Sequence, residues 1–313
     1  MIDLDQENVL VTGAYGFLGG HLVDALTARD MHIHAPSPGD YDLRDPDHVR
    51  EMLREHRPTV VFHLAARCGG IGANQQTPAT FFLDNMRMGL NVLDECAHAK
   101  LRKVVMVGTV CSYPKHCPTP FRESDLWNGY PEETNAAYGV AKRALITAAE
   151  AYRAEHGLNA ITVLPANLYG PRDHFELETS HVIPAMVRKF EEARIAGAST
   201  VTLWGDGSPT REFLYVEDAA RGLILAAENY DEPVPMNLGN GKEVAIRDLA
   251  VMVAEATGYA GTIEWDGMRP NGQPRRCLDT SSASLFLDFG TRVSLADGLR
   301  RTVEWYRSNP IRS

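Results

Sequence analysis

Apolar runs and helix-like stretches alternate along the first half of the chain. The apolar runs contain few polar residues, which is typical of strands buried on both faces of a parallel sheet. Five runs of this kind lie at residues 8–12, 31–35, 59–64, 103–107 and 160–164. Helix-like stretches lie between them at residues 17–29, 46–55, 78–98 and 136–155. This order predicts an α/β protein with a Rossmann-type, doubly wound parallel sheet.

The regular alternation ends near residue 170. Loop-like segments with proline and glycine lie at residues 171–180, 196–211 and 259–277, and helices are expected near 181–195, 245–257 and 294–306. A helix starting near Val216 and a strand near 235–238 are expected to return to the main sheet. We therefore predict two parts. They are a dinucleotide-binding domain of residues 1–170 plus about 212–240, and a smaller C-terminal α/β substrate-binding lobe of about 171–211 plus 241–313.

The composition is that of an ordinary globular protein, with 44% hydrophobic and 23% charged residues. The formal net charge of -10 disfavours nucleic acid or an anionic membrane as the main partner. The first residues are acidic and polar, and no apolar run approaches the length of about 20 residues that a membrane span needs. Five cysteines without a CxxC pair favour a reduced cytoplasmic protein with neither structural disulfides nor a metal site.

The motif VLVTGAYGFLGGHL places Gly13, Gly16 and Gly19 between the first strand and the first helix. The first glycine permits a tight turn, and the second lets the backbone approach a pyrophosphate at the helix N-terminus. The third lets the helix and the strand pack closely. Because the motif follows an N-terminal strand in a βαβ chain, it predicts a dinucleotide site.

The end of the second strand leaves the kind of dinucleotide open. NAD sites usually have an acidic residue about 20 residues after the glycine motif, where it binds the ribose 2′-hydroxyl. Here HIHAPSPGD has no carboxylate before Asp40, so NADP(H) is admissible. The same stretch has no arginine that could bind a 2′-phosphate, and NAD is therefore not excluded.

The stretch NAAYGVAKRA places Tyr138 and Lys142 one turn apart on a predicted helix. A nearby ammonium favours the tyrosinate and is expected to lower the pKa of Tyr138. Such a phenol can exchange a proton with a carbonyl or carbinol oxygen near neutral pH. Thr109, at the end of strand 103–107, is expected to contribute a further hydrogen bond to the same oxygen.

Together, TGxxGxxG, the strand-end hydroxyl and YxxxK resemble the extended short-chain dehydrogenase/reductase superfamily. Further blocks are similar to the GDP-L-fucose synthase family, whose members are 3,5-epimerases and 4-reductases of GDP-4-keto-6-deoxymannose. The blocks are HLAARCGGIGANQQTPATFFLDNMRMGLNVLDEC, VCSYPKHCPTPFRESDLWNG, LPANLYGPRDHF, SHVIPAMVRKFEEA, VTLWGDGSPTREFLYVEDAA and RPNGQPRRCLD. They occur in order over nearly the whole chain.

The resemblance implies that Cys111 and His181 act as acid and base beside a sugar ketone, and that NADPH then reduces this ketone. A thiol and an imidazole suit this work because their pKa values bracket neutrality. The catalytic residues expected are Thr109, Cys111, Tyr138, Lys142 and His181. The cofactor residues expected are Gly13, Tyr15, Gly16, Phe17, Leu18, Gly19, Leu64, Ala65, Ala66, Tyr138, Lys142, Pro165, Asn167, Leu168 and His181. The substrate residues expected are Asn167, Arg188, Trp204, Arg211, Asn271 and Arg276. The resemblance also implies a homodimer.

Three positions depart from the family's pattern. Thr109 stands where the family usually has serine, Asn271 where it has aspartate, and Tyr15 where some members have an arginine in the glycine loop. These departures bear on whether the nucleotide is GDP and whether the cofactor is NADP or NAD. They do not bear on the proposed reaction. Cys68 and Cys117 have no argued partner and are assigned to packing.

Other interpretations are weighed against this one. The main alternative is a relative with only one of the two activities, acting on another NDP-4-keto sugar such as a GDP-6-deoxy-4-keto-heptose. A 4,6-dehydratase is expected to have an Asp-Glu pair where this chain has Val110 and Cys111. A UDP-sugar 4-epimerase has no use for the thiol, and a non-enzymatic dinucleotide sensor has no use for the pair of Tyr138 and Lys142.

Overall fold

Six parallel strands form the main sheet of the computed structural model, which describes residues 1–269 and 271–309. The strands lie in the order β2-β1-β3-β4-β5-β9. Their bounds are β1 Val9–Thr12, β2 Ile33–His34, β3 Val60–His63, β4 Lys103–Val107, β5 Ala160–Pro165 and β9 Met236–Leu238. The five predicted strands and the returning strand are all present, which confirms the doubly wound parallel sheet.

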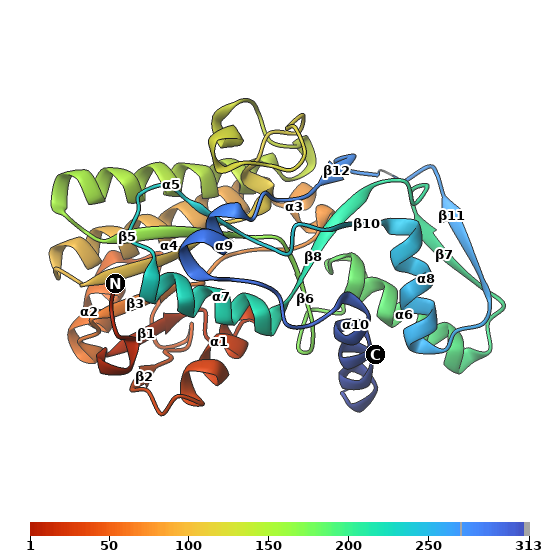
Figure 1. The fold of residues 1–313 in the computed structure, drawn as a ribbon, viewed down its shortest axis with the longest axis horizontal. Helices are drawn as coiled ribbons and strands as arrows, with labels where there is room; N and C mark the ends of the chain where they lie inside the picture. Colours follow the sequence, from red (N-terminus) through yellow and green to blue (C-terminus); the bar gives the residue numbers. More distant parts are fainter. Residues whose placement is uncertain (270, 310–313) are drawn as a thin grey trace.

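Helices cover both faces of this sheet (Figure 1). Their bounds are α1 Phe17–Thr27, α2 Pro46–His56, α4 Pro78–His98, α5 Ala136–His156 and α7 Val216–Asn229. α1 packs against α7 on one face, and α4 lies between α2 and α5 on the other. Val9 and Val11 of β1 belong to the apolar cluster that contains α1 and α7, whereas Leu10 belongs to the cluster with α2 and α4. Since successive side chains point to opposite faces, both faces need apolar residues, and the first three residues of β1 are all apolar.

A second group of helices and short strands lies beside the main sheet (Figure 1). Its members are β6 Asn167–Tyr169, α6 Val182–Ala196, β7 Thr200–Trp204, β8 Thr210–Tyr215, β10 Glu243–Ala245, α8 Ile246–Thr257, β11 Thr262–Asp266, β12 Arg275–Arg276 and α10 Leu295–Ser308. β8 pairs with β6, β10 and β12, and β7 pairs in parallel with β11. An apolar cluster that includes Phe190, Leu249 and Val303 fills this group. The helices predicted near 181–195, 245–257 and 294–306 are confirmed.

Several elements were not predicted from the sequence. β7 and β11 lie in segments expected to be loops, and α3 (Ile71–Gln76) lies in an expected glycine-rich turn. β7 alternates buried and partly or fully exposed residues, unlike the mostly buried strands β1, β3, β4 and β5 of the main sheet. The remaining elements are α9 Ser281–Leu287 and the 3-10 turns Leu4–Gln6, Val110–Ser112, Glu123–Trp127 and Glu133–Asn135.

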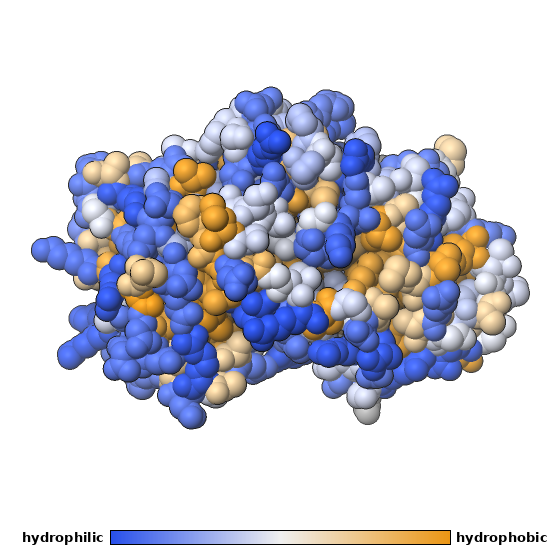
Figure 2. All heavy atoms as spheres, viewed as in Figure 1, coloured by the Kyte–Doolittle hydropathy of each residue, from blue (hydrophilic) through white to orange (hydrophobic). Residues whose placement is uncertain are grey.

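The separate apolar clusters support the predicted division into a dinucleotide-binding domain and a substrate-binding lobe, and this division stays a prediction. Residues 270 and 310–313, which were assigned to the lobe, lie outside the described residues. Hydrophilic side chains cover much of the face shown in Figure 2, with smaller apolar areas among them. Within the described part of the chain, every helix is too short or too polar to cross a membrane.

Candidate active site

A cavity of about 1320 Å³ lies at the carboxyl ends of the main-sheet strands. Gly13 after β1, Ala65 after β3, Thr109 after β4 and Asn167 after β5 all line it. In open α/β sheets, ligands bind at this edge, next to the point where the strand order reverses. That point lies at β1, because β2 and β3 flank it on opposite sides. The cavity therefore lies where the glycine motif predicts a dinucleotide.

The glycine motif forms the tight turn that the sequence predicts. Gly13 has a φ of +72°, and a Cβ there would lie 2.6 Å from the backbone nitrogen of Ala65. A Cβ at Gly19 would lie 2.0 Å from the carbonyl oxygen of Gly13. Gly16 is the N-cap of α1, and no side chain of the described residues caps this helix end. The backbone thus forms a cradle at a helix N-terminus, which fits the pyrophosphate of a dinucleotide.

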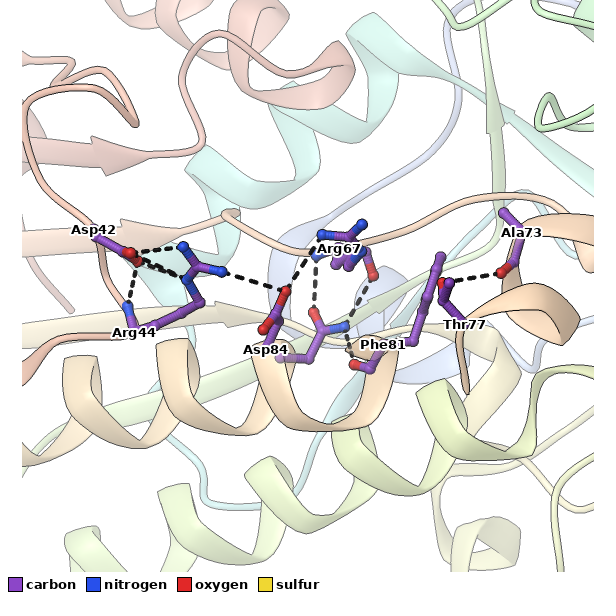
Figure 3. Close-up of polar contacts among 8 residues, drawn as sticks. Asp42, Arg44, Arg67, Ala73, Thr77, Phe81 and Asp84 are labelled. Carbon is purple, nitrogen blue, oxygen red and sulfur yellow. Dashed lines mark hydrogen bonds and ion pairs between the residues drawn. The ribbon is translucent and has the colours of Figure 1, made fainter. Parts of the chain in front are cut away.

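A row of aspartate and arginine side chains lines another part of the cavity (Figure 3). Arg44 donates to both carboxylate oxygens of Asp42, at 2.8 and 2.7 Å. Its guanidinium also lies 3.8 Å from Asp84, which pairs with Arg67 at 3.4 Å. Arg44 lies well beyond the end of β2 and outside the stretch HIHAPSPGD, in which a ligand of the 2′-phosphate is expected. The structure thus brings an arginine to the cavity from the segment that follows β2.

Thr109, Tyr138 and Lys142 line the cavity together. Thr109 follows β4, and α5 carries the other two residues one turn apart. Lys142 Nζ donates to the carbonyl oxygen of Val107 at 2.9 Å. Burial lowers the pKa of Lys142 to about 8. The predicted trio of hydroxyl, phenol and ammonium is therefore assembled at one strand end.

The expected lowering of the Tyr138 pKa was wrong for this structure. Burial raises the pKa of Tyr138 well above its usual value, and negative charge on Cys68 and Cys111 acts in the same direction. The hydroxyl of Thr109 opposes this shift without cancelling it. The ammonium of Lys142 is bonded to a backbone carbonyl and does not compensate for the lost hydration. The raised pKa favours the protonated phenol, which is the form that can donate a proton.

Cys111 lies in the 3-10 turn Val110–Ser112 at the end of β4. The hydroxyl oxygen of Thr109 accepts a hydrogen bond from the Cys111 N–H at 3.2 Å and so caps this turn. A Cβ at Gly139 would lie 2.4 Å from the carbonyl oxygen of Cys111, so α5 packs directly against the turn. The thiol and the neighbouring Tyr138 thus come from two elements in close contact.

His181 is the N-cap residue of α6 and lines the same cavity. His181 is exposed to the cavity, but protein surrounds the rest of its side chain. This desolvation lowers the pKa of His181. The positive charges of His174 and Arg276 lower the pKa of His181 further. A neutral imidazole can accept a proton. The structure therefore brings the predicted thiol and imidazole to one cavity from distant parts of the chain.

Two arginines of the cavity have no carboxylate at ion-pair distance among the described residues. Arg211 donates to backbone carbonyl oxygens. Arg276 donates to Gln273 at 3.1 Å and to Asn167 and Cys111 at 3.5 Å. Burial lowers the pKa of Arg211, and the charge of Arg276 is the second cause. Two neighbouring guanidinium groups that form no ion pair with the described residues are a suitable site for a diphosphate.

Trp204 and Asn271 lie together in a further part of the cavity lining. The indole of Trp204 is 52% exposed, and the guanidinium of Arg269 lies 5.0 Å from its ring centroid. Asn271 Oδ1 accepts a hydrogen bond from the N–H of Asp206 at 3.0 Å. This bond ties Asn271 to the segment that follows Trp204. An exposed aromatic face of this kind can stack on a nucleobase.

The structure does not bring Arg188 to the cavity. Its guanidinium pairs with Glu176 and Glu192, at 3.2 and 2.7 Å. The next residue, Lys189, lines the cavity instead. Adjacent helical residues point about 100° apart, so a shift of one position changes which side chain faces the site. Cys68, which was assigned to packing, also lines the cavity.

The other predicted site residues all line the cavity, and their roles stay predictions. Those not yet placed are Tyr15, Phe17, Leu18, Leu64, Ala66, Pro165 and Leu168. Sequence reasoning missed Asn74, Asn135 and Gln273, although each lies in or next to a motif or block that was considered. Among the described residues, no group of three or more His, Cys, Asp or Glu side chains is placed to hold a metal ion.

Comparison with known proteins shows the family of this chain. Residues 9–239 match the NAD dependent epimerase/dehydratase family. The chain is 38% identical to GDP-L-fucose synthase 1 of Arabidopsis thaliana, over 96% of this chain and 93% of that protein. It is 35% identical to the GDP-L-fucose synthase of Escherichia coli K12, over 99% of each chain. The chain belongs to the GDP-L-fucose synthase family.

Solved structures show how far the fold of the GDP-L-fucose synthase family extends over this chain. A GDP-L-fucose synthetase from Naegleria fowleri bound to NADP matches with a TM-score of 0.90 and 28% identity, over 99% of this chain and 96% of that chain. A GDP-6-OMe-4-keto-L-xylo-heptose reductase from C. jejuni matches with a TM-score of 0.91 and 26% identity, over 96% and 97%. The fold is therefore shared over nearly the full length of both proteins.

Proposed function

We propose that the protein is an NADPH-dependent 3,5-epimerase and 4-reductase that converts a GDP-4-keto-6-deoxy-hexose to the GDP-6-deoxy sugar. The observation that carries this proposal is that Cys111, His181 and Tyr138 line one cavity with the glycine motif. A thiol and an imidazole suit proton exchange at carbon, and a phenol suits proton donation to a carbonyl oxygen. The curated relatives named GDP-L-fucose synthase support the substrate.

Epimerisation uses the acidity of the carbons beside the C4 ketone. One of Cys111 and His181 removes the proton from C3 or C5, and the electrons of the broken C–H bond form an enolate at O4. The other group returns a proton to the opposite face of the same carbon, so each inversion consumes and releases one proton. The hydroxyls of Thr109 and Tyr138 donate hydrogen bonds to O4 and stabilise its negative charge.

Reduction uses the same carbonyl after epimerisation. NADPH, when bound along the glycine motif, supplies the hydride that adds to C4. Tyr138 donates its phenolic proton to O4, so the ketone becomes an alcohol. Lys142 lies one turn along α5 and stabilises the tyrosinate that remains. Thr109 keeps O4 within reach of the phenol.

The substrate's nucleotide fits the cations and the aromatic residue of the cavity. Arg211 and Arg276 bind the diphosphate, since guanidinium forks match phosphate oxygens. Trp204 stacks on the base, and Asn167 binds the sugar or the nicotinamide. The cofactor is NADP(H), because no carboxylate follows β2 directly and the Naegleria fowleri structure, which has nearly the same fold, binds NADP.

A substrate panel tests this function. The purified protein is incubated with NADPH or NADH and with GDP-, dTDP- and UDP-linked 4-keto-6-deoxy-hexoses, together with a GDP-6-deoxy-4-keto-heptose. We expect cofactor oxidation to be fastest with NADPH and the GDP-hexose, and NMR of the product to show inversion at C3 and C5. Turnover of the heptose alone, or a product reduced at C4 without inversion, would overturn the proposal.

We also propose that the protein is a homodimer in which α4 and α5 of two copies pack around a two-fold axis. α4 and α5 lie side by side, and Phe82 and Leu83 of α4 are 39% and 44% exposed. Light scattering should give twice the mass of one chain, whereas a monomer at micromolar concentration would reject the dimer. The cytoplasmic location expected from the cysteines stays a prediction.

A further inference from the structure

The sulfur of Cys111 accepts hydrogen bonds from two side chains. Asn135 Nδ2 and Arg276 Nη1 each lie 3.5 Å from Sγ. Asn135 ends the 3-10 turn that precedes α5 and is the N-cap residue of this helix, whereas Arg276 belongs to β12. The thiol is therefore held by donors from two elements that are far apart in the sequence.

The oxygen of the Asn135 amide lacks a partner. Asn135 Oδ1 is buried and accepts no hydrogen bond from the described residues, and the same holds for Oδ1 of Asn74, which is 4% exposed. Both asparagines line the active-site cavity and also a neighbouring cavity of about 410 Å³ between α3 and the turn Glu133–Asn135. A buried acceptor without a partner is costly. The two oxygens therefore point to a bound molecule that donates hydrogen bonds, as sugar hydroxyls do.

We propose that Asn135 is a positioning residue for epimerisation. Its amide nitrogen holds the Cys111 sulfur, and its amide oxygen accepts a hydrogen bond from a hydroxyl of the sugar. This inference rests on the proposed function. One planar group then sets the position of the thiol relative to the sugar ring, and proton transfer depends strongly on such positioning. Reduction relies on Tyr138 and does not need the contact between the amide and the sulfur.

The variant Asn135→Asp tests the donor function of the amide nitrogen separately from the acceptor function of the amide oxygen. A carboxylate has nearly the same size and keeps an acceptor oxygen, but it donates nothing to the sulfur. We expect deuterium exchange from D2O at C3 and C5 to fall by about 10²-fold or more, and hydride transfer from NADPH to the same 4-keto sugar to fall by less than about tenfold. Asn135→Ser, which keeps a small polar side chain, serves if the first variant does not fold. Asn128→Ala, at an exposed asparagine outside the cavity lining, should match the wild type in both assays.

A second readout needs no substrate. Alkylation of Cys111 by iodoacetamide, followed by peptide mass spectrometry, reports on the sulfur itself. We expect it to slow by about tenfold in Asn135→Asp, because the variant removes a donor and adds a negative charge beside the thiolate. Unchanged exchange, an equal loss of exchange and hydride transfer, or unchanged alkylation would each overturn the inference. A wild-type protein with neither exchange nor NADPH oxidation would instead reject the proposed function, and the alkylation rates would still test the contact.

Discussion

In the proposed mechanism, the thiol of Cys111 acts in epimerisation and not in reduction. We predict that Cys111→Ser loses deuterium exchange at C3 and C5 by about 10²-fold or more, because a serine hydroxyl is a far weaker acid than a thiol. Hydride transfer to a 4-keto sugar should persist, since Tyr138 and Thr109 are unchanged. Exchange is measured by NMR in D2O without cofactor. Unimpaired exchange in this variant would reject the role of the cysteine.

Tyr138 is the proton donor of the proposed reduction. We predict that Tyr138→Phe lowers the rate of NADPH-dependent reduction by about 10²-fold or more, because the variant keeps the ring but lacks the phenolic proton. Initial rates of cofactor oxidation check this, with Tyr130→Phe, at an exposed tyrosine, as the matched control. Normal turnover in the Tyr138 variant would remove this residue from the mechanism.

The lowered pKa of His181 predicts how exchange depends on pH. A histidine with a lowered pKa stays neutral to lower pH, so its ability to accept a proton persists below the ordinary value of about 6.5. The rate of exchange should therefore hold as pH falls to 6.5 and decline only below it. The rate is measured across this range for the wild type and for His181→Gln. A decline centred at or above pH 6.5 would contradict the shift.

At the level of single residues, the sequence predicts which residues line the cavity better than it predicts their protonation states. The glycine motif, the Tyr138–Lys142 spacing and the blocks around Cys111 and His181 all led to residues that line the cavity. The protonation of Tyr138 was mispredicted, because burial dominates its pKa and burial follows from tertiary packing. The choice between Arg188 and Lys189 depends on the rotation of α6 about its axis. Sequence spacing alone does not determine that rotation.

At the level of elements, prediction succeeded where burial on both faces makes a strand mostly apolar. The strands of the main sheet lie between two layers of helices, so their pattern is unambiguous. β7 and β11 form a pair with several exposed positions, and glycine follows β7 and precedes β11. The glycine and proline around these short segments favour loops, so the sequence predicts no strand there. α3 has only six residues, too few for a clear helical period.

The contact between β1 and β3 gives a prediction for stability. His63 of β3 is buried opposite Thr12 of β1, and its ring nitrogen lies 2.9 Å from the threonine hydroxyl. Burial lowers the pKa of His63 to about 3. Between about pH 6.5 and 3 the unfolded chain binds a proton at this histidine and the folded chain does not. The free energy of unfolding should therefore fall as pH decreases, by up to about 1.4 kcal/mol per pH unit from this residue.

Denaturant unfolding at pH 7, 6 and 5 measures this effect. His63→Asn removes the titrating group but keeps a polar partner for Thr12, so the variant should lose less stability between pH 7 and 5 than the wild type. His98→Gln, at an exposed histidine of α4, should retain the wild-type slope. Equal slopes in the wild type and His63→Asn would show that His63 binds its proton equally in the folded and unfolded chains, and would contradict the lowered pKa.

At the level of the whole molecule, the site depends on contacts between distant segments. The carboxyl ends of the main sheet supply the glycine cradle, Thr109 and Cys111, and the second group of elements supplies His181 and Arg276. The hydrogen bond from Arg276 to Cys111 joins these two parts at the sulfur of Cys111. The order of motifs along the chain predicts which residues take part. Their convergence around one sulfur could be established only from the folded structure.

The central claim is that one cavity performs both proton exchange at carbon and reduction of the same sugar. It is tested most directly by converting the GDP-4-keto-6-deoxy-hexose with NADPH in D2O and determining the product by NMR. The account predicts a GDP-6-deoxy sugar inverted at C3 and C5, with deuterium at both carbons and hydrogen from NADPH at C4. A product that is reduced at C4 but has no deuterium at C3 and C5 would contradict it.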